Sequence, residues 1–522
     1  MGGGLMQLVA YGAQDVYLTG NPQITFWKVT YRRHTNFAME SIEQTFNGQA
    51  DFGRRVTCTI SRNGDLAYRT YLQVTLPEIG QTLENTTGEG VHARWLDFPG
   101  HQLIENVEVE IGGQRIEKQY GDWMHIWNQL TMDKNQEAGY NKMVGNTTQL
   151  TFVTDPSYAD VDGPCDSDAP RQVCAPRNAL PETTLYVPLQ FWFCCNPGLA
   201  LPLIALQYHE VKVNLDLRAI DECLWAVSEV GAASGSDKKV TAAYAQSLVS
   251  ASLYVDYIYL DTDERRRMAQ NPHEYLIEQL QYTGAESVGS SANKIRLNFN
   301  HPCKELVWVV QPDCNVDYCA GTTPGNPLYD ALGAQPFNYT DAMDALPNSI
   351  KAFGSTETVN GTTAFIGADG LFETDNALEV TSSGNLGAKV SGVSDAGTFV
   401  LAETSLDMHC WGENPVVTAK LQLNGQDRFS EREGTYFDQV QPWQHHTRAP
   451  DTGINVYSFA LRPEEHQPSG TCNMSRIDNA TLQLVLSNAA VSGSNTAKVR
   501  VYARNYNVLR IMSGMGGLAY SN

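Results

Sequence analysis

The segment "VEVEIGGQR" (residues 107–115) alternates apolar and acidic side chains and then reaches two glycines. A period of two is typical of a strand with one buried face, and Gly-Gly after such a strand predicts a tight hairpin turn. The pattern returns 312 residues later as "AKLQLNGQD" (419–427), with Asn-Gly at the turn. This recurrence suggests that one β unit occurs twice in the chain.

Three further landmarks recur in the same order in both halves, which strengthens the case for a duplication. They are "SIEQTFNG" (41–48) with "LIEQLQYTG" (276–284), "RVTCTI…YLQVTLP" (55–77) with "KIRLNF…LVWVVQP" (294–312), and "LYVPLQFWF" (185–193) plus "HEVKVNLDL" (209–217) with "INVYSFALR" (454–462) plus "NATLQLVL" (479–486). The spacing between partners varies along the chain. We therefore expect long loop insertions at 134–180 in the first copy and 320–400 in the second.

These patterns predict an all-β fold of two tandem antiparallel eight-stranded jelly rolls, with long loop insertions and few short helices. The predicted organisation is an N-terminal arm (1–30), a first jelly roll (31–260), a linker (261–274), a second jelly roll (275–508) and a C-terminal Gly-rich tail (509–522). Helical spacing of Trp123, Met124, Trp127 and Leu130 predicts a helix within 120–133. In the linker, Asp263 is expected to cap a short helical turn that Pro272 stops.

Bulk composition excludes several classes of protein. Of the 522 residues, 42% are apolar and 18% are charged, as in a folded globular protein. The formal net charge of −22 argues against a protein whose main task is to hold DNA. Residues 1–20 lack the features of a secretory signal, and the densest apolar run, 199–206, is too short to span a membrane.

The segment "FALRPEEHQPSGTCNMSRIDNATLQLVL" (459–486) gathers groups that could form an active site. Its two carboxylates, imidazole, hydroxyl and thiol belong to Glu464, Glu465, His466, Ser469 and Cys472. The equivalent segment of the first copy, "CCNPGLALPLIALQY", is almost uncharged, so the two copies share no such site. Proline and glycine also mark the segment as a turn. We therefore interpret it as a polar corner between two strands and predict no catalytic residue.

The motif search indicates no metal site and no cofactor. The 11 cysteines include no CxxC pair and are interpreted as free thiols in a reducing compartment. "DCNVDY" (313–318) departs from a calcium loop at the positions that require Gly and Glu. The pairs His409-Cys410 and His445-His446 are adjacent, and neighbours on a strand point to opposite faces.

The arginine run, one aromatic segment and the N-x-[ST] sequons each allow two interpretations. Arg265–Arg267 could contact nucleic acid, but the flanking acids favour a self-paired surface or an interface. "FWF" (191–193) is expected to alternate in a strand and to fill the core. N-x-[ST] sequons occur at Asn473 and Asn479 and in the expected loops, where glycosylation is possible at Asn85, Asn146, Asn338 and Asn360.

Four long stretches resemble the major capsid proteins of nucleocytoplasmic large DNA viruses. They are "GGLMQLVAYGAQDVYLTGNPQITFWKVTYRRHTNF" (3–37), "LPLIALQYHEVKVNLDL" (201–217), "DTDERRRMAQNPHEYLIEQLQ" (261–281) and "RPEEHQPSGTCNMSRID…VRVYARNYNVLRIMSGMGGLAYSN" (462–522). The resemblance spans essentially the whole chain and is weakest in the two predicted loops.

The resemblance implies a structural major capsid protein and not an enzyme. It implies a double jelly roll that forms homotrimers, which are pseudo-hexameric capsomers tiling the icosahedral shell of a virion over an internal membrane. Its implied partners are neighbouring capsomers, minor capsid proteins and penton proteins, with the N-terminal arm on the inner side. The membrane is contacted indirectly and nucleic acid not directly, and assembly takes place in a virus factory in the host cytoplasm.

Two other classes remain open at this stage. A tandem jelly-roll lectin or attachment protein would bind through the loops, which carry Tyr140, Tyr158, Tyr329 and Tyr339 but no Trp. A cupin-type enzyme would hold a metal through two or three histidines and a carboxylate. No His-x-His occurs in either copy, which argues against the cupin class.

Overall fold

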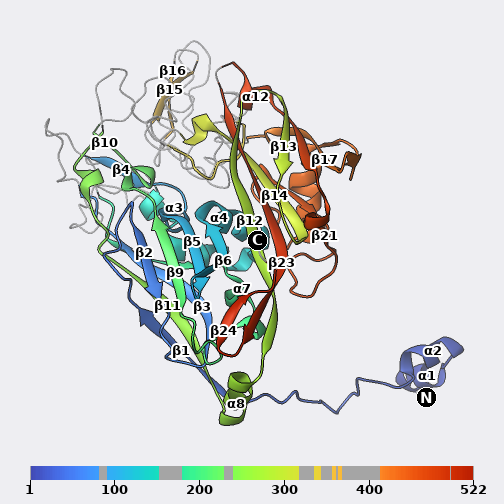
Figure 1. The fold of residues 1–522 in the computed structure, drawn as a ribbon. Coiled ribbons are helices and arrows are strands. Elements are labelled where there is room, and N and C mark those ends of the chain that lie inside the picture. The colour runs from blue at the N-terminus through green and yellow to red at the C-terminus, as the bar shows by residue number, and fades with distance from the viewer. Residues whose placement is uncertain are drawn as a thin grey trace.

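The structure is a computed structural model in which two β-rich units lie side by side (Figure 1). It describes residues 2–80, 91–151, 154, 179–228, 239–316, 334–341, 355–359, 362–366, 412–493 and 495–520. Helix α8 (Thr262–Gln270) lies at one end of the molecule and connects the two units, and the N-terminal arm extends away from the body near that end.

The first unit contains two sheets with four main strands each. One sheet has the order β1-β11-β3-β7 and the other the order β2-β9-β5-β6, and all their pairings are antiparallel. The strands are β1 (Phe37–Gln44), β2 (Arg55–Thr59), β3 (Leu66–Leu76), β5 (Ile104–Ile111), β6 (Gln114–Tyr120), β7 (Thr183–Pro188), β9 (Val211–Leu217) and β11 (Ser250–Leu260).

The second unit repeats this topology strand for strand. Its sheets have the orders β12-β23-β14-β20 and β13-β22-β17-β18. The strands are β12 (His273–Val288), β13 (Ala292–Leu297), β14 (Pro302–Pro312), β17 (Val416–Leu423), β18 (Gln426–Asp427), β20 (Ile454–Ser458), β22 (Ala480–Leu486) and β23 (Ala497–Met512). Each recurring segment occupies the same place in its unit, and this strand order is that of a jelly roll. The predicted fold class is confirmed.

Short elements decorate the two jelly rolls. The remaining strands are β4 (His92–Trp95), β8 (Leu201–Pro202), β10 (Leu224–Val227), β15 (Ser355–Val359), β16 (Thr362–Ile366), β19 (Arg432–Glu433), β21 (Cys472–Asn473) and β24 (Met515–Leu518). The other α-helices are α1 (Gly3–Val9), α2 (Ala13–Thr19), α3 (Pro99–Leu103), α4 (Gly121–Thr131), α5 (Glu137–Val144), α6 (Thr148–Thr151), α7 (Trp192–Cys195), α11 (Gln441–His445) and α12 (Asn488–Val491). No helix in the described ranges is long and apolar enough to cross a bilayer.

The two hairpin turns that suggested the duplication have the backbone that their residues predict. Gly112 and Gly113 have φ of 57° and 88°, and Asn424 and Gly425 have φ of 50° and 81°. Positive φ at both central residues is the requirement of a type I′ turn, which matches the twist of the flanking strands. The turns therefore fix the register of β5 against β6 and of β17 against β18.

Strand β14 shows how the two jelly rolls are joined. Ten of its 11 residues are buried. The strand therefore lacks the alternation of buried and exposed side chains that is typical of a strand with one solvent-exposed face. Trp308 and its same-face neighbours pack into the core of the second roll. Val307 and Val309 face the other way and pack with helix α4 of the first roll. The helix predicted within 120–133 is confirmed, and its apolar side covers this outer face of the second roll.

The C-terminus corrects one expectation. Residues 509–522 were expected to form a Gly-rich tail, but β23 continues to Met512 and turns at Gly514 (φ 79°) into β24. Leu509 and Ile511 are buried in the core of the first roll. Gly516 passes so close to Leu206 that a Cβ would come within 2.7 Å of its side chain. The glycines here allow close packing against the first roll.

Three local expectations are also corrected. Asp261, and not Asp263, caps α8, since its carboxylate accepts from the Thr262 N–H at 2.8 Å. "FWF" (191–193) is buried as expected but leads into helix α7 and is not a strand. The described start of the insertion at 134–180 is helical, because α5 and α6 occupy it. Most of 320–400 lies outside the described residues, apart from 334–341 and the β15–β16 hairpin, which lies at the end of the molecule opposite α8 (Figure 1).

We predict that the two termini contribute very differently to stability. Deletion of residues 2–30 should leave the midpoint of urea unfolding unchanged, because none of these residues is buried. Deletion of 509–520 should lower that midpoint strongly, because it removes buried Leu509 and Ile511 from the core. Equal midpoints for the two truncated proteins would contradict the packing described above.

Candidate functional site

The five polar groups of the segment 459–486 do not converge. The Glu464 carboxylate points to His446, whereas Glu465 pairs with the exposed Arg462 at 2.9 Å. Ser469 accepts the Arg462 N–H at 3.0 Å and so closes the loop. Cys472 lies opposite Cys303 across the β14–β21 pair. The segment is a polar corner, as interpreted from the sequence, and His466 approaches only Glu278, at 3.8 Å.

Behind this corner lies a buried ion network centred on His446, which directly follows helix α11. Its Nδ1 lies 2.9 Å from Glu464 Oε1 and its Nε2 lies 2.9 Å from Glu305 Oε2. The side chains of His446 and Glu305 are both 0% exposed. An ionised carboxylate only accepts hydrogen bonds, so both ring nitrogens must donate. His446 is therefore an imidazolium.

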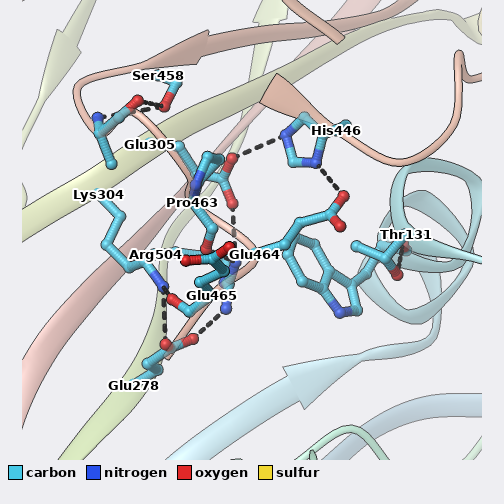
Figure 2. A network of polar contacts seen from close by, with 12 residues as sticks. Thr131, Glu278, Lys304, Glu305, His446, Ser458, Pro463, Glu464, Glu465 and Arg504 are labelled. Atoms are coloured by element: carbon cyan, nitrogen blue, oxygen red, sulfur yellow. Dashed lines mark hydrogen bonds and ion pairs between the residues drawn. The ribbon is translucent and has the colours of Figure 1, made fainter. Parts of the chain in front are cut away.

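The network continues from Glu305 to the sheet behind it, as Figure 2 shows. Arg504 Nη1 donates to Glu305 Oε1 at 2.9 Å, and its Nη2 contacts Glu278. Lys304 Nζ lies 2.7 Å from the same Glu278 and also donates to the Glu465 carbonyl oxygen at 3.2 Å. These side chains come from β12, β14 and β23, which are neighbours in one sheet.

The electrostatics of the network follow from burial and pairing. Burial alone would raise the pKa of Glu305, but His446 and then Arg504 outweigh it and hold this pKa at about 2. Burial would lower the pKa of His446, but Glu305 and then Glu464 raise it to about 9. Both groups are thus charged at neutral pH, and each depends on the other.

Helix α4 of the first roll seals the network from the outside. The Arg504 guanidinium lies 3.8 Å from the centre of the Trp127 ring, and that ring also meets His446 edge-on. At the start of α4, Asp122 pairs with Arg218 of the first roll at 3.3 Å and with Arg500 of the second at 3.2 Å. One carboxylate therefore ties both rolls together. We refer to this contact of α4, β6 and α7 with β12, β14 and β23 as the inter-roll junction.

A cavity of about 430 Å³ lies in the inter-roll junction beside the network. Glu117, Trp127 and Cys195 line it from the first roll, and Glu278 and Arg504 from the second. Cys195 is exposed, and its thiol lies 3.4 Å from the Phe191 carbonyl oxygen. Glu278 and Glu464 in the cavity wall each hold a cation of the network. The arrangement is suited to holding two β units rigidly together.

The sequons have different surroundings. Asn338 is 2% exposed, and its amide bonds Gln335 and Thr340, so the folded chain does not present it for glycosylation. Asn146 is half-buried in the turn after α5. Asn85 and Asn360 lie outside the described residues.

Of the four tyrosines considered for a sugar-binding surface, Tyr140 and Tyr339 lie in the described part of the chain. Tyr140 donates to or accepts from the buried His101 at 2.7 Å, and Tyr339 is 1% exposed. Tyr158 and Tyr329 lie outside the described residues. Within the described ranges, no group of three or more His, Cys, Asp or Glu side chains could hold a metal ion.

Sequence reasoning missed the ion network, although one signal was present. "CKELVWVV" (303–310) places Lys304 and Glu305 at the start of a run of buried apolar residues. Charged side chains are rarely buried unless they are paired, so they predict partners from elsewhere in the chain. The sequence does not show that His446 and Arg504 are those partners.

Arg265, the other charged feature, has a structural role. Its guanidinium binds the buried Asp65 through two contacts of 2.9 and 3.0 Å and anchors α8 to the first roll. The partner is thus Asp65, 200 positions away, and not one of the flanking acids that suggested a self-paired surface. Arg266 and Arg267 are exposed.

We predict that Glu305→Gln lowers the free energy of unfolding by about 3–5 kcal/mol, because it leaves His446 and Arg504 buried without their shared carboxylate. An amide has one acceptor oxygen in place of two, and its NH₂ would face a donor. Urea unfolding at pH 7 measures the effect. The control is Glu465→Gln, whose exposed pair with Arg462 should contribute at most about 1 kcal/mol. Equal losses in the two variants would refute a dominant role of the buried network.

The network also predicts a pH dependence. The pKa of His446 is raised to about 9 from an ordinary value near 6.5, so its stabilisation is complete below that ordinary value and is lost as the pH rises through 9. Urea midpoints should therefore fall between pH 6.5 and 8.5 in the native sequence. They should fall less in His446→Gln, which has no imidazole to titrate. Parallel pH profiles would show that His446 is not the titrating group.

Comparison with known proteins agrees with this architecture. A family model described as "Major capsid protein N-terminus" matches residues 25–261, and one described as "Large eukaryotic DNA virus major capsid protein" matches residues 264–517. The chain is 78% identical to the major capsid protein of Phaeocystis pouchetii virus over the full length of both.

Solved structures support the same assignment. The PBCV-1 virus capsid chain is 35% identical with a TM-score of 0.61, and the match covers 95% of this chain and all of that one. The Faustovirus major capsid protein, at 15% identity and a TM-score of 0.63 over 96% and 94% of the two chains, shares the fold. The two jelly rolls, their inter-roll junction and these matches show that the chain belongs to the major capsid protein family of large eukaryotic DNA viruses, structural proteins of the virion and not enzymes.

Proposed function

We propose that three copies of this chain form a homotrimeric capsomer with pseudo-hexagonal outline. The observation that carries the proposal is that one chain presents two jelly rolls of the same strand order side by side. A ring of three chains then offers six similar units to its neighbours, which suits hexagonal packing in a shell. Closed cyclic assembly is also the usual outcome for identical subunits.

The N-terminal arm is the proposed contact to other shell components. Every residue from 2 to 36 other than Asp15 is exposed, including large apolar side chains that a folded surface normally covers. The most exposed are Tyr17, Leu18, Ile24, Phe26, Trp27 and Tyr31. Minor capsid and penton proteins on the inner side of the shell are the partners we propose, with an internal membrane beyond them.

Location and modification complete the proposal. We place assembly in a virus factory of the host cytoplasm, in line with the free cysteines found among the described residues. The net charge of −22 fits a shell that does not touch the genome directly.

Glycosylation is proposed for Asn85, Asn146 and Asn360 only. The proposed division into an arm (1–30), two jelly rolls and the linker 261–274 is supported by β11, which ends at Leu260, and by α8, which lies within the linker.

The native mass in solution tests the trimer. Three chains of 57.6 kDa make 172.8 kDa, and light scattering after size exclusion should give that mass, unchanged on tenfold dilution, because obligate interfaces of this kind bury more than about 2,000 Å². The protein lacking residues 2–30 is the matched control and should also be trimeric, since its jelly rolls are intact. A dilution-stable monomer would refute the capsomer and favour a binding module.

A further inference from the structure

The cavity of the inter-roll junction contains acceptor groups that no partner satisfies. Glu117 on β6 is 6% exposed, and its Oε1 accepts from Gln119 Nε2 at 2.9 Å. Its Oε2 has no hydrogen-bond partner in the described part of the chain, and neither has Gln119 Oε1. Both side chains line the cavity. Two buried oxygens without partners in one cavity can accept hydrogen bonds from a bound ligand once Glu117 is ionised.

The charge balance around the cavity points to a cation. The neighbouring network is neutral in sum, because three carboxylates meet three cations: Glu278, Glu305 and Glu464 with Lys304, Arg504 and His446. Glu117 is a fourth carboxyl, and no salt bridge pairs it with a cation of its own in the described ranges. When Glu117 is ionised, one bound positive charge would balance it.

The walls indicate what kind of cation would fit. Trp123, Trp127 and Trp192 and the apolar Leu199 and Leu280 line the same space. Apolar walls favour an alkyl chain over a hydrated metal ion. A volume near 430 Å³ is sufficient for a small organic molecule. Pro197 and His466, at the edge of the cavity, are partly accessible to solvent.

We propose that the inter-roll junction binds a primary alkylammonium group, with the ammonium on Glu117 Oε2 and Gln119 Oε1 and the alkyl chain against the tryptophans. The site is built by both jelly rolls of a single chain, so it does not depend on the trimer. An amine held by Glu117 on β6 lies beside Leu280 on β12, which lines the same cavity, so its binding stabilises the docked arrangement of the two rolls.

Binding is linked to a proton. Burial raises the pKa of Glu117 to about 8, so in the empty site this carboxyl is protonated at neutral pH. The cation favours the ionised form, and its binding releases that proton. The charged or titratable groups that face Glu117 from the surrounding elements are Arg504 on β23, Glu278 on β12, Cys195 on α7, and Glu464 and His466 in the corner loop.

Ligand-observed NMR titration of the full-length protein with n-butylamine tests the site, with 1-butanol as the uncharged probe of similar shape. We expect butylamine to bind at least tenfold more tightly than butanol. Its affinity should rise by up to tenfold per pH unit from pH 6 and level off near 8. Nα-acetyl-lysine amide distinguishes the source of the ammonium group. If this compound binds, the natural ligand is a lysine side chain; if it does not bind, the ligand is a free amine.

The variant Glu117→Gln should weaken butylamine binding at least tenfold and remove its pH dependence. The matched control Glu286→Gln changes an exposed carboxylate on β12 and should leave both unchanged. Equal affinity for amine and alcohol, or the same amine affinity in Glu117→Gln, would overturn the proposal and assign the orphan oxygens to ordered water. Should Glu117→Gln fail to fold, the proposal is still tested by two measurements on the native sequence: the comparison of amine with alcohol and the pH profile of amine binding.

Discussion

The buried guanidinium of Arg504 is the interaction on which the junction between the two jelly rolls depends. A charge removed from water is tolerated only when it is paired and its hydrogen bonds are satisfied. Glu278 and Glu305 supply the pairing, and the Trp127 ring covers the remaining face at 3.8 Å. Because Trp127 belongs to the first roll, the docked first roll shields the ion pairs of the second roll from water.

The duplicated fold explains why this network occurs only once. The segment after β7 in the first roll is equivalent to the segment after β20 in the second, and the two approach each other across the cavity. The first-roll segment is almost uncharged and packs its leucines into the core. The second-roll segment carries Glu464, whose carboxylate completes the pairing of His446. The copies share backbone topology, whereas the facing loops have become complementary in chemistry.

The sequence was sufficient for the fold where local chemistry decides the backbone. Asn424-Gly425 and the alternation in 419–423 dictate a hairpin wherever it lies, and the spacing of Trp123, Trp127 and Leu130 dictates an amphipathic helix. The sequence was insufficient where contacts between distant residues decide the backbone conformation. "FWF" resembles a strand, yet the core accepts the two aromatics as a helix turn with Phe191 stacked on Phe193. The C-terminal glycines suggest a loose tail until Leu206 is known to lie against Gly516.

The candidate site was harder to predict for the same reason. His446 and Arg504 lie 141 and 199 positions after their shared partner Glu305, so no local sequence pattern joins them. The corner segment attracted notice by its density of polar residues, but density in sequence does not imply convergence in space. Glu464 turns inward and Glu465 outward, as neighbours at a turn commonly do.

The internal position of the junction has a consequence for assembly. A contact between identical subunits must be compatible with every copy in the ring, which restricts how specialised it can become. A contact between two rolls of one chain is free of that restriction, because each side is encoded once. Asp122 can therefore bind Arg218 on its own roll and Arg500 on the other without a symmetric counterpart. Covalent linkage also removes the entropy cost of bringing the rolls together, so they can associate through a polar, cavity-containing contact that two free subunits would hold only weakly.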